Sequence, residues 1–211
     1  MECFNEDNFI SLCDKLAKKD KDLKAVIKQY GYPPMWGRIP SFATLIHIIL
    51  EQQVSLASAK AAFLKLEGRI GHITPEKVLL LTDEEMKVCY FSRQKIIYAR
   101  YLAKAIVHNE FSIEKIIALD DESLRTEMKK LKGIGDWTTD VFMMMALHRC
   151  DCFPTGDIAL MKSIKEVKNI DSNTSKEEVL VIANKWKPYR TIAAFILWHA
   201  YIKKRGIKLQ G

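Results

Sequence analysis

The chain has 211 residues, of which 48% are hydrophobic and 28% charged, and a formal net charge of +7 at pH 7. This composition supplies enough apolar residues for one sizeable core or two small subdomains, and it excludes an intrinsically disordered chain. No apolar run has the length of a membrane-spanning helix, the first residues do not resemble a secretory signal, and the excess positive charge suits a polyanionic partner.

The five cysteines are scattered along the chain. They form no CxxC pair, no Cys/His zinc spacing and no four-cysteine spacing typical of an iron–sulfur loop. We therefore expect reduced thiols, no iron–sulfur cluster and a cytoplasmic protein.

Helical periodicity dominates the chain, and the alternation typical of strands is almost absent. The segment 31–40 contains three prolines and two glycines, which forbid a helix and separate an N-terminal helix from the rest. Start signals include Pro75 in the first turn of a helix and a capping box from Thr82 to Glu85. In chain order, the predicted helices span residues 6–29, 41–51, 55–70, 75–80, 83–89, 92–108, 113–118, 121–131, 136–148, 157–167, 175–185 and 189–204.

Gly133 and Gly135 stand one residue apart between two predicted helices. A Gly-x-Gly hairpin there exposes amide groups at a helix N-terminus, where they can bind an anion such as a phosphate. Lys132 adds positive charge beside the turn. Asp136 opposes this interpretation unless its side chain turns away. The alternative is an ordinary helix C-cap at Gly133.

Asp157 follows the loop Phe153-Pro154-Thr155-Gly156 and begins a helical pattern, so an ordinary N-cap is one interpretation of it. Gln52 and Gln53 close an apolar helix, where they either cap backbone groups or project into a groove. Aromatic faces suited to stacking on a base are found at Trp36, Trp137 and Tyr189, whereas Trp186 and Trp198 are interpreted as core residues.

These segments together resemble the helix-hairpin-helix DNA glycosylases, and most closely their 3-methyladenine DNA glycosylase II branch. The matches run in order from residue 41 to residue 198. They comprise Ser41-Phe42-Ala43-Thr44-Leu45, Gln52-Gln53-Val54-Ser55, Phe91-Ser92-Arg93-Gln94-Lys95, Leu131-Lys132-Gly133-Ile134-Gly135-Asp136-Trp137-Thr138, Phe153-Pro154-Thr155-Gly156-Asp157 and Lys187-Pro188-Tyr189-Arg190 with Trp198.

The resemblance implies an all-α fold of two helical subdomains with the active-site cleft between them. It predicts a central subdomain over residues 41–135, ending in the hairpin, and a second subdomain made of residues 1–40 with 136–211. The N-terminal β-rich domain of the branch's best-known bacterial member is not expected, because the chain has no room for it.

The resemblance also implies a monofunctional glycosylase that excises alkylated bases, of the 3-methyladenine and 7-methylguanine type, from duplex DNA in base excision repair. Asp157 would be the catalytic carboxylate, and Trp137, Tyr189 and Trp36 would wall the base pocket. Trp137 stands where glycosylase/lyases have a lysine nucleophile, so no Schiff base and no AP lyase activity are expected. The expected DNA-binding residues are Gln52, Gln53 (as the minor-groove wedge), Ser55, Lys132, Gly133, Ile134, Gly135 and Thr138.

A monovalent cation, Na⁺ or K⁺, held by the hairpin carbonyls of Lys129, Leu131 and Ile134 is the one cofactor that the resemblance implies. The implied partner is duplex DNA containing damaged bases, and the protein is expected to bind it as a monomer. No interaction with a membrane is expected. Two alternatives remain: a glycosylase for another lesion, such as uracil or a mismatched or deaminated base, and a non-catalytic helix-hairpin-helix DNA-binding module.

Overall fold

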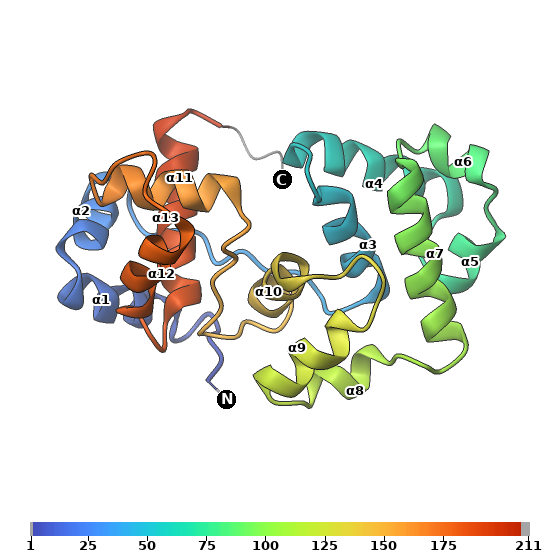
Figure 1. Ribbon diagram of the computed structural model, residues 1–211, viewed down its shortest axis with the longest axis horizontal. Coiled ribbons are helices and arrows are strands. Elements are labelled where there is room, and N and C mark those ends of the chain that lie inside the picture. The colour runs from blue at the N-terminus through green and yellow to red at the C-terminus, as the bar shows by residue number, and fades with distance from the viewer. Residues whose placement is uncertain (1, 208–211) are drawn as a thin grey trace. The chain divides into compact units, whose positions relative to one another are not determined.

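The computed structural model describes residues 2–207, and the regular secondary structure of this part of the chain is helical apart from one isolated β-bridge between Cys3 and Arg149 (Figure 1). The all-α prediction is therefore confirmed. None of the described helices is long and apolar enough to cross a membrane. The described helices are α1 (Phe9–Lys19), α2 (Lys21–Tyr30), α3 (Phe42–Glu51), α4 (Leu56–Ile70), α5 (Pro75–Leu80), α6 (Asp83–Val88), α7 (Arg93–Val107), α8 (Ile113–Ile117), α9 (Asp121–Lys129), α10 (Asp136–Met145), α11 (Ile158–Val167), α12 (Lys176–Asn184) and α13 (Arg190–Lys204).

The helices group into two compact units. The central unit spans Arg38–Phe142, and the terminal unit joins the described residues up to Gly37 with those from Met143 onward. The sequence places a division after Gly135, whereas the contacts divide the chain inside α10. The carboxylate of Asp140, in the first part of α10, bonds Arg125 of α9 at 2.5 Å and so ties the start of α10 to the central unit.

The central unit is built around α3, in which nearly every residue is buried. A helix that is apolar on all sides needs neighbours on all sides, and α3 packs against α4 and α7. The α7 helix in turn packs against α5 and α6, while α8 packs against α9 (Figure 1). The α3 helix therefore lies inside the central unit, enclosed by neighbouring helices.

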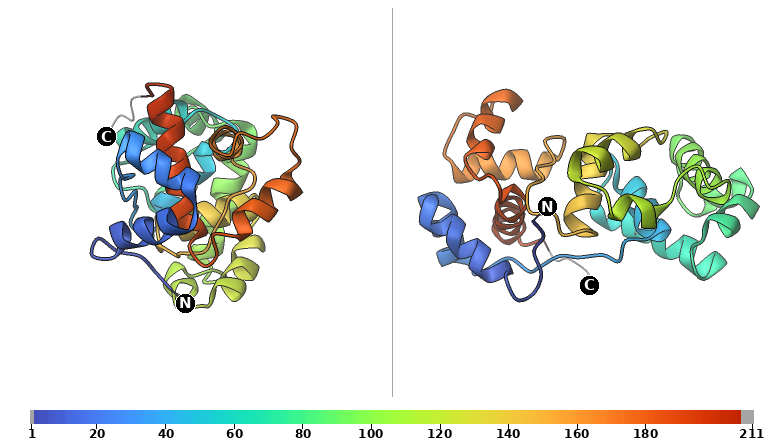
Figure 2. Two further views of the ribbon diagram at one scale, coloured as in Figure 1. Left: turned by 90° about the vertical axis from the view of Figure 1, so that its left-hand side faces the viewer. Right: turned by 90° about the horizontal axis from the view of Figure 1, so that it is seen from below.

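The terminal unit has a comparable central element in α13, whose residues from Thr191 to Leu197 are all buried. This helix packs against α1, α2 and α11. In both views of Figure 2 the N-terminal helices α1 and α2, in blue, lie beside α13, in red. The unit therefore joins the two ends of the chain around one shared core.

The prediction of one helix over residues 6–29 is wrong, because the chain breaks at Asp20 between α1 and α2. The Asp20 carboxylate caps α2 by accepting from the amides of Asp22 and Leu23. It also accepts from Lys168 Nζ at 2.5 Å and from Trp186 Nε1 at 2.7 Å. Sequence periodicity missed the break because both partners lie far away in the chain.

Most other helices begin within a residue or two of the predicted starts. Residues predicted to begin helices, such as Ser41, Ser55 and Asp157, are N-caps, so the helices start one residue later. The predicted capping box is present, because Thr82 Oγ1 accepts from the Glu85 amide at 3.2 Å and the Glu85 carboxylate accepts from the Thr82 amide at 2.8 Å.

Candidate active site

The Gly-x-Gly turn lies between α9 and α10, and its two glycines have different reasons to be there. Gly133 has a φ of +86°, and a Cβ added to it would lie 2.2 Å from the ring of Tyr98 on α7. No other residue type fits this position. Gly135 has no positive φ, and a Cβ added there would meet no atom within 4 Å. Its surroundings leave space for a ligand.

The backbone amides of this turn are available for an anion. The amide of Ile134 closes the turn by donating to the carbonyl of Leu131 at 3.1 Å. The amides of Gly133 and Gly135 donate to no residue within the described range 2–207. Unpartnered amides next to the start of a helix form a phosphate-binding arrangement.

The charged side chains around the turn favour the same ligand. Lys132 is exposed beside Gly133. The Asp136 carboxylate, which would repel a phosphate, accepts a hydrogen bond from Lys129 Nζ at 2.7 Å. This ion pair offsets the negative charge at the start of α10, which removes the main electrostatic objection to phosphate binding.

Gln52 and Gln53, which follow α3 directly, are arranged differently from each other. The Gln52 side-chain nitrogen donates to the Gly133 carbonyl and to Thr138 Oγ1, both at 2.9 Å. Thr138 is only 2% exposed, so its side chain lies inside the protein. Gln53 is exposed and adopts a left-handed φ of 58°. Ser55 caps α4, accepting from the Ser58 amide at 3.2 Å.

Trp137 occupies the first turn of α10 and is half-buried.

Two acidic residues of the central unit have structural roles. Glu51 is bound by Arg38 through two hydrogen bonds, at 2.5 Å and 3.1 Å, and Asp140 is paired with Arg125. Both carboxylates belong to buried residues, and both are neutralised by a neighbouring guanidinium.

Asp157 is the N-cap of α11 in the terminal unit. Its Oδ1 accepts from the Leu160 amide at 2.7 Å and from the indole Nε1 of Trp198 at 3.1 Å. The first bond fixes the carboxylate at the helix N-terminus, where the helix dipole stabilises negative charge. The second bond fixes its rotation. The group is thus an oriented and half-exposed carboxylate.

Trp198 is the residue that the sequence interpretation assigned wrongly, because it is half-buried and bonds Asp157 rather than filling the core. It belongs to an aromatic cluster with Trp36 and Phe195. The Trp36 ring lies 6.5 Å from Trp198 and 5.3 Å from Phe195, both in edge-on geometry. The signal that could have found Trp198 is its inclusion among the resemblance segments.

Trp36 and Tyr189, both predicted to wall a base pocket, have different surroundings. The Trp36 ring lies edge-on to Trp198, and the Trp198 indole in turn donates to Asp157. The Tyr189 ring has the ammonium of Lys15 at 5.6 Å from its centre. A cation of the protein itself therefore already interacts with the Tyr189 ring.

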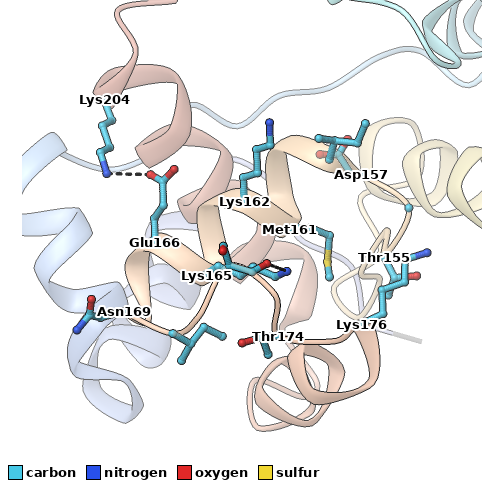
Figure 3. Close-up of a pocket in the computed structure, with 14 residues that line it drawn as sticks. Thr155, Asp157, Met161, Lys162, Lys165, Glu166, Asn169, Thr174, Lys176 and Lys204 are labelled. Carbon is cyan, nitrogen blue, oxygen red and sulfur yellow. Dashed lines mark hydrogen bonds and ion pairs between the residues drawn. The ribbon is translucent and has the colours of Figure 1, made fainter.

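A groove of about 770 Å³ runs along α11 and begins at Asp157 (Figure 3). None of the predicted pocket aromatics lines it. Its charged walls include Lys162, Lys165 and Lys176, and Lys204 pairs with Glu166 at 2.9 Å. Hydrogen bonds from Arg205 and Lys204 lower the pKa of Glu166 to about 2. The groove therefore carries positive charge, and no aromatic side chain lines it.

Within residues 2–207, no group of three or more His, Cys, Asp or Glu side chains could hold a metal ion. The hairpin carbonyls are the remaining oxygen donors of interest. The Leu131 carbonyl already accepts from the Ile134 amide and keeps a second lone pair for another partner.

Comparison with known proteins places these features in a family. The model of the HhH-GPD superfamily of base excision DNA repair proteins matches residues 46–188. A Bacillus subtilis DNA-3-methyladenine glycosylase is 28% identical over 209 residues, covering 93% of this chain and 69% of the relative. DNA-3-methyladenine glycosylase 1 of Schizosaccharomyces pombe is 28% identical over 191 residues, covering 87% of this chain and 83% of the relative.

Solved structures show the same likeness. A 3-methyladenine DNA glycosylase from Schizosaccharomyces pombe in complex with abasic DNA superimposes with a TM-score of 0.83 and 26% identity, covering 89% of this chain and 95% of that one. A DNA-3-methyladenine glycosidase from Bacillus halodurans gives a TM-score of 0.73 with 25% identity, covering 98% and 95% of the two chains.

Proposed function

Because the chain belongs to the HhH-GPD superfamily of base excision DNA repair proteins, we propose that it is a DNA glycosylase that excises alkylated bases, of the 3-methyladenine and 7-methylguanine type, from duplex DNA. The relatives named DNA-3-methyladenine glycosylase support this activity. The observation that carries the proposal is the Asp157 carboxylate, which is held by Leu160 and Trp198 beside an aromatic cluster.

The carboxylate has a defined role in this hydrolysis. As the bond between C1′ and the base nitrogen breaks, its electron pair leaves with the base, and positive charge develops on the deoxyribose. Asp157 stabilises this oxocarbenium-like charge and orients a water, whose oxygen bonds C1′ while its proton is released. An alkylated purine carries a positive charge and departs as a neutral base, so little acid catalysis is required.

Recognition of the base and of the DNA backbone draws on separate parts of the chain. The rings of Trp36 and Trp198 offer electron-rich faces, which attract a cationic purine by roughly 0.5–2 kcal/mol. Trp137 and Tyr189 stay predictions as further pocket walls. The free amides of Gly133 and Gly135 bind a phosphate. The exposed loop of residues 53–58, here called the Gln53 loop, enters the space left by the extruded nucleotide.

We propose further that the enzyme has no AP lyase activity, because Trp137 offers no amine at the position after the hairpin where a lyase has its lysine. An abasic duplex incubated with the protein should stay intact under conditions that prevent spontaneous cleavage. Borohydride should trap no covalent complex. A trapped adduct between the protein and the DNA would contradict this proposal.

A monovalent cation at the hairpin is a separate proposal. Backbone carbonyl oxygens, here those of Lys129, Leu131 and Ile134, are donors that hard cations prefer. The Leu131 carbonyl, with a lone pair to spare, fits this use. The ion would supply positive charge beside the bound phosphate. Affinity for undamaged duplex should then be higher in K⁺ or Na⁺ than in a bulky organic cation at equal ionic strength.

The decisive test of the activity is Asp157→Asn on methylated duplex DNA. Asparagine keeps the capping oxygen, so α11 should remain folded and DNA binding should persist. Release of free bases, resolved by chromatography, should fall by about 10³-fold or more because the charge is lost. Asp120→Asn is a matched control, because Asp120 caps α9 through its amide bonds to Glu122 and Ser123.

Three other outcomes would redirect the assignment. Release by Asp157→Asn near the wild-type rate would remove Asp157 from the mechanism. Release of uracil or a mismatched base in place of methylated purines would make the protein a glycosylase for another lesion. DNA binding without release of any base would indicate a non-catalytic module.

We also propose that the protein is a monomer, so light scattering should give the mass of a single chain.

A further inference from the structure

The loop that follows α3 is exposed at its tip and fixed at its root. Residues 53–58 are all exposed. Two ties hold the last turn of α3 beneath them. Lys95 Nζ donates to the Leu50 carbonyl at 2.6 Å, and Arg38 binds the buried Glu51 carboxylate. The loop therefore projects from an end of α3 that cannot move freely.

Gln52 provides a third tie, and this one reaches the phosphate-binding hairpin. An amide side chain has two N–H donors, and Gln52 uses its nitrogen to bond both the Gly133 carbonyl and Thr138 Oγ1. The first acceptor belongs to the hairpin and the second to the first turn of α10. Because these donors are used inside the protein, they are not directed at DNA.

Gln53 and its exposed neighbours directly follow Gln52 in the chain. Gln53 has a left-handed φ of 58°, which is unfavourable for a residue with a side chain and persists only when its surroundings impose it. Val54 and Leu56 follow with 45% and 57% of their surface exposed. Gln52, which directly precedes these exposed residues, is held in place by its two hydrogen bonds.

We propose that Gln52 is a positioning residue that sets the Gln53 loop against the hairpin, so that phosphate binding and base extrusion act through one rigid element. This inference rests on the proposed glycosylase function. A phosphate bound at Gly133 and Gly135 fixes the position of the hairpin on the DNA. Because Gln52 bonds the hairpin, it also fixes the position of the loop relative to the stacked bases. Without the Gln52 side chain the hairpin still binds DNA, but the loop is no longer held in a fixed position relative to the hairpin.

The test uses Gln52→Met, which keeps the length of the side chain and removes both donors. Affinity for undamaged duplex should change by less than about threefold, because the hairpin amides are untouched. Fluorescence of 2-aminopurine placed beside a methylated base reports unstacking, and its rise on binding should be largely lost. Single-turnover base release should fall by about tenfold or more. Gln29→Met, at an exposed position on α2, is the matched control and should behave as wild type.

A second readout separates positioning from a general loss of structure. Placing the lesion opposite a mismatched base lowers the cost of extrusion. The defect of Gln52→Met in base release should therefore shrink on the mismatched duplex. Thermal melting followed by circular dichroism checks the fold. Thr138→Val removes one of the two bonds alone, so it should give a smaller loss of unstacking and add little in the Gln52→Met background.

Several results would overturn the inference. Gln52→Met that binds undamaged duplex about tenfold more weakly, with a normal fluorescence rise at saturation, would make Gln52 a direct DNA contact. A variant with unchanged unstacking and release would leave Gln52 no positioning role. If Gln52→Met does not fold, Gln52→Leu, which also lacks both donors, carries the same comparison, and normal unstacking by it would reject the coupling. Wild-type protein that releases no base would refute the proposed function, while the binding and unstacking measurements would still decide the role of Gln52.

Discussion

The indole Nε1 of Trp198 donates a hydrogen bond to Oδ1 of Asp157 at 3.1 Å, which joins α13 to the N-cap of α11. The residues are 41 positions apart in sequence. Trp186 makes an equivalent bond, because its Nε1 donates to Asp20 Oδ2 at 2.7 Å. Two indoles therefore orient two carboxylates in the same unit, and only one of these carboxylates is proposed to act on substrate.

Trp198→Phe tests this orientation, because it removes the N–H donor and keeps an aromatic ring. A hydrogen bond to a charged group contributes about 1.5 kcal/mol or more, so base release should fall by about tenfold. The matched control is Trp186→Phe, which makes the same change beside Asp20. It should lower the melting temperature and leave base release per folded molecule unchanged. Equal rates for the two variants would contradict the role of Trp198.

The two hairpin glycines should respond differently to alanine. Gly133→Ala places a Cβ in the Tyr98 ring at a left-handed φ and should destabilise the protein by about 3 kcal/mol. Gly135→Ala meets no atom within 4 Å, so its stability should be near wild type. Its methyl group approaches the bound phosphate, and DNA affinity should fall by about tenfold. Urea unfolding and fluorescence anisotropy measure the two effects, and a stable Gly133→Ala would refute the steric argument.

Asp20 should make stability depend on pH in the acid range. Burial raises the pKa of this carboxyl, but hydrogen bonds from Lys168 and Trp186 outweigh it and hold the pKa below the ordinary 3.8. Because the folded pKa is the lower one, the carboxylate stabilises the fold above pH 3.8, and this contribution is lost as pH falls through the folded pKa.

Asp20→Asn keeps the capping oxygen and removes the charge that faces Lys168. We expect a loss of about 2 kcal/mol at pH 7. The difference from wild type should narrow as pH falls from 3.8 through the lower pKa of the folded protein, below which the wild-type carboxyl is also neutral. Urea unfolding at pH 7 and pH 3 measures both values. A difference that widens at low pH would mean that folding raises the pKa of Asp20 instead of lowering it.

Lys132 should contribute a phosphate contact that salt screens. Lys132→Gln should weaken binding to all DNA sequences alike and reduce the slope of log K against log salt by about 1. Lys24→Gln, which removes an exposed lysine of α2, should leave the slope unchanged. Anisotropy titrations at several salt concentrations provide the slopes, and equal slopes for Lys132→Gln and wild type would remove Lys132 from the interface.

Local chemistry made most of the fold predictable. Helix starts such as Ser41, Thr82 and Asp157 were found because an N-cap bonds amides two or three residues away, within reach of a sequence pattern. The hairpin was found for the same reason, because a left-handed turn at Gly133 needs glycine. The break at Asp20 was missed because Lys168 and Trp186, which hold it, lie 148 and 166 residues away.

The sequence by itself determined the all-α class, the hairpin and the candidate carboxylate, because helical periods, turn glycines and caps act over a few residues. Tertiary structure alone decided which side chains meet. It paired Trp198 with Asp157, turned Asp136 toward Lys129 and directed Gln52 into the hairpin. These contacts depend on how α13, α3 and α10 pack, and packing is set by long-range burial that no local pattern encodes.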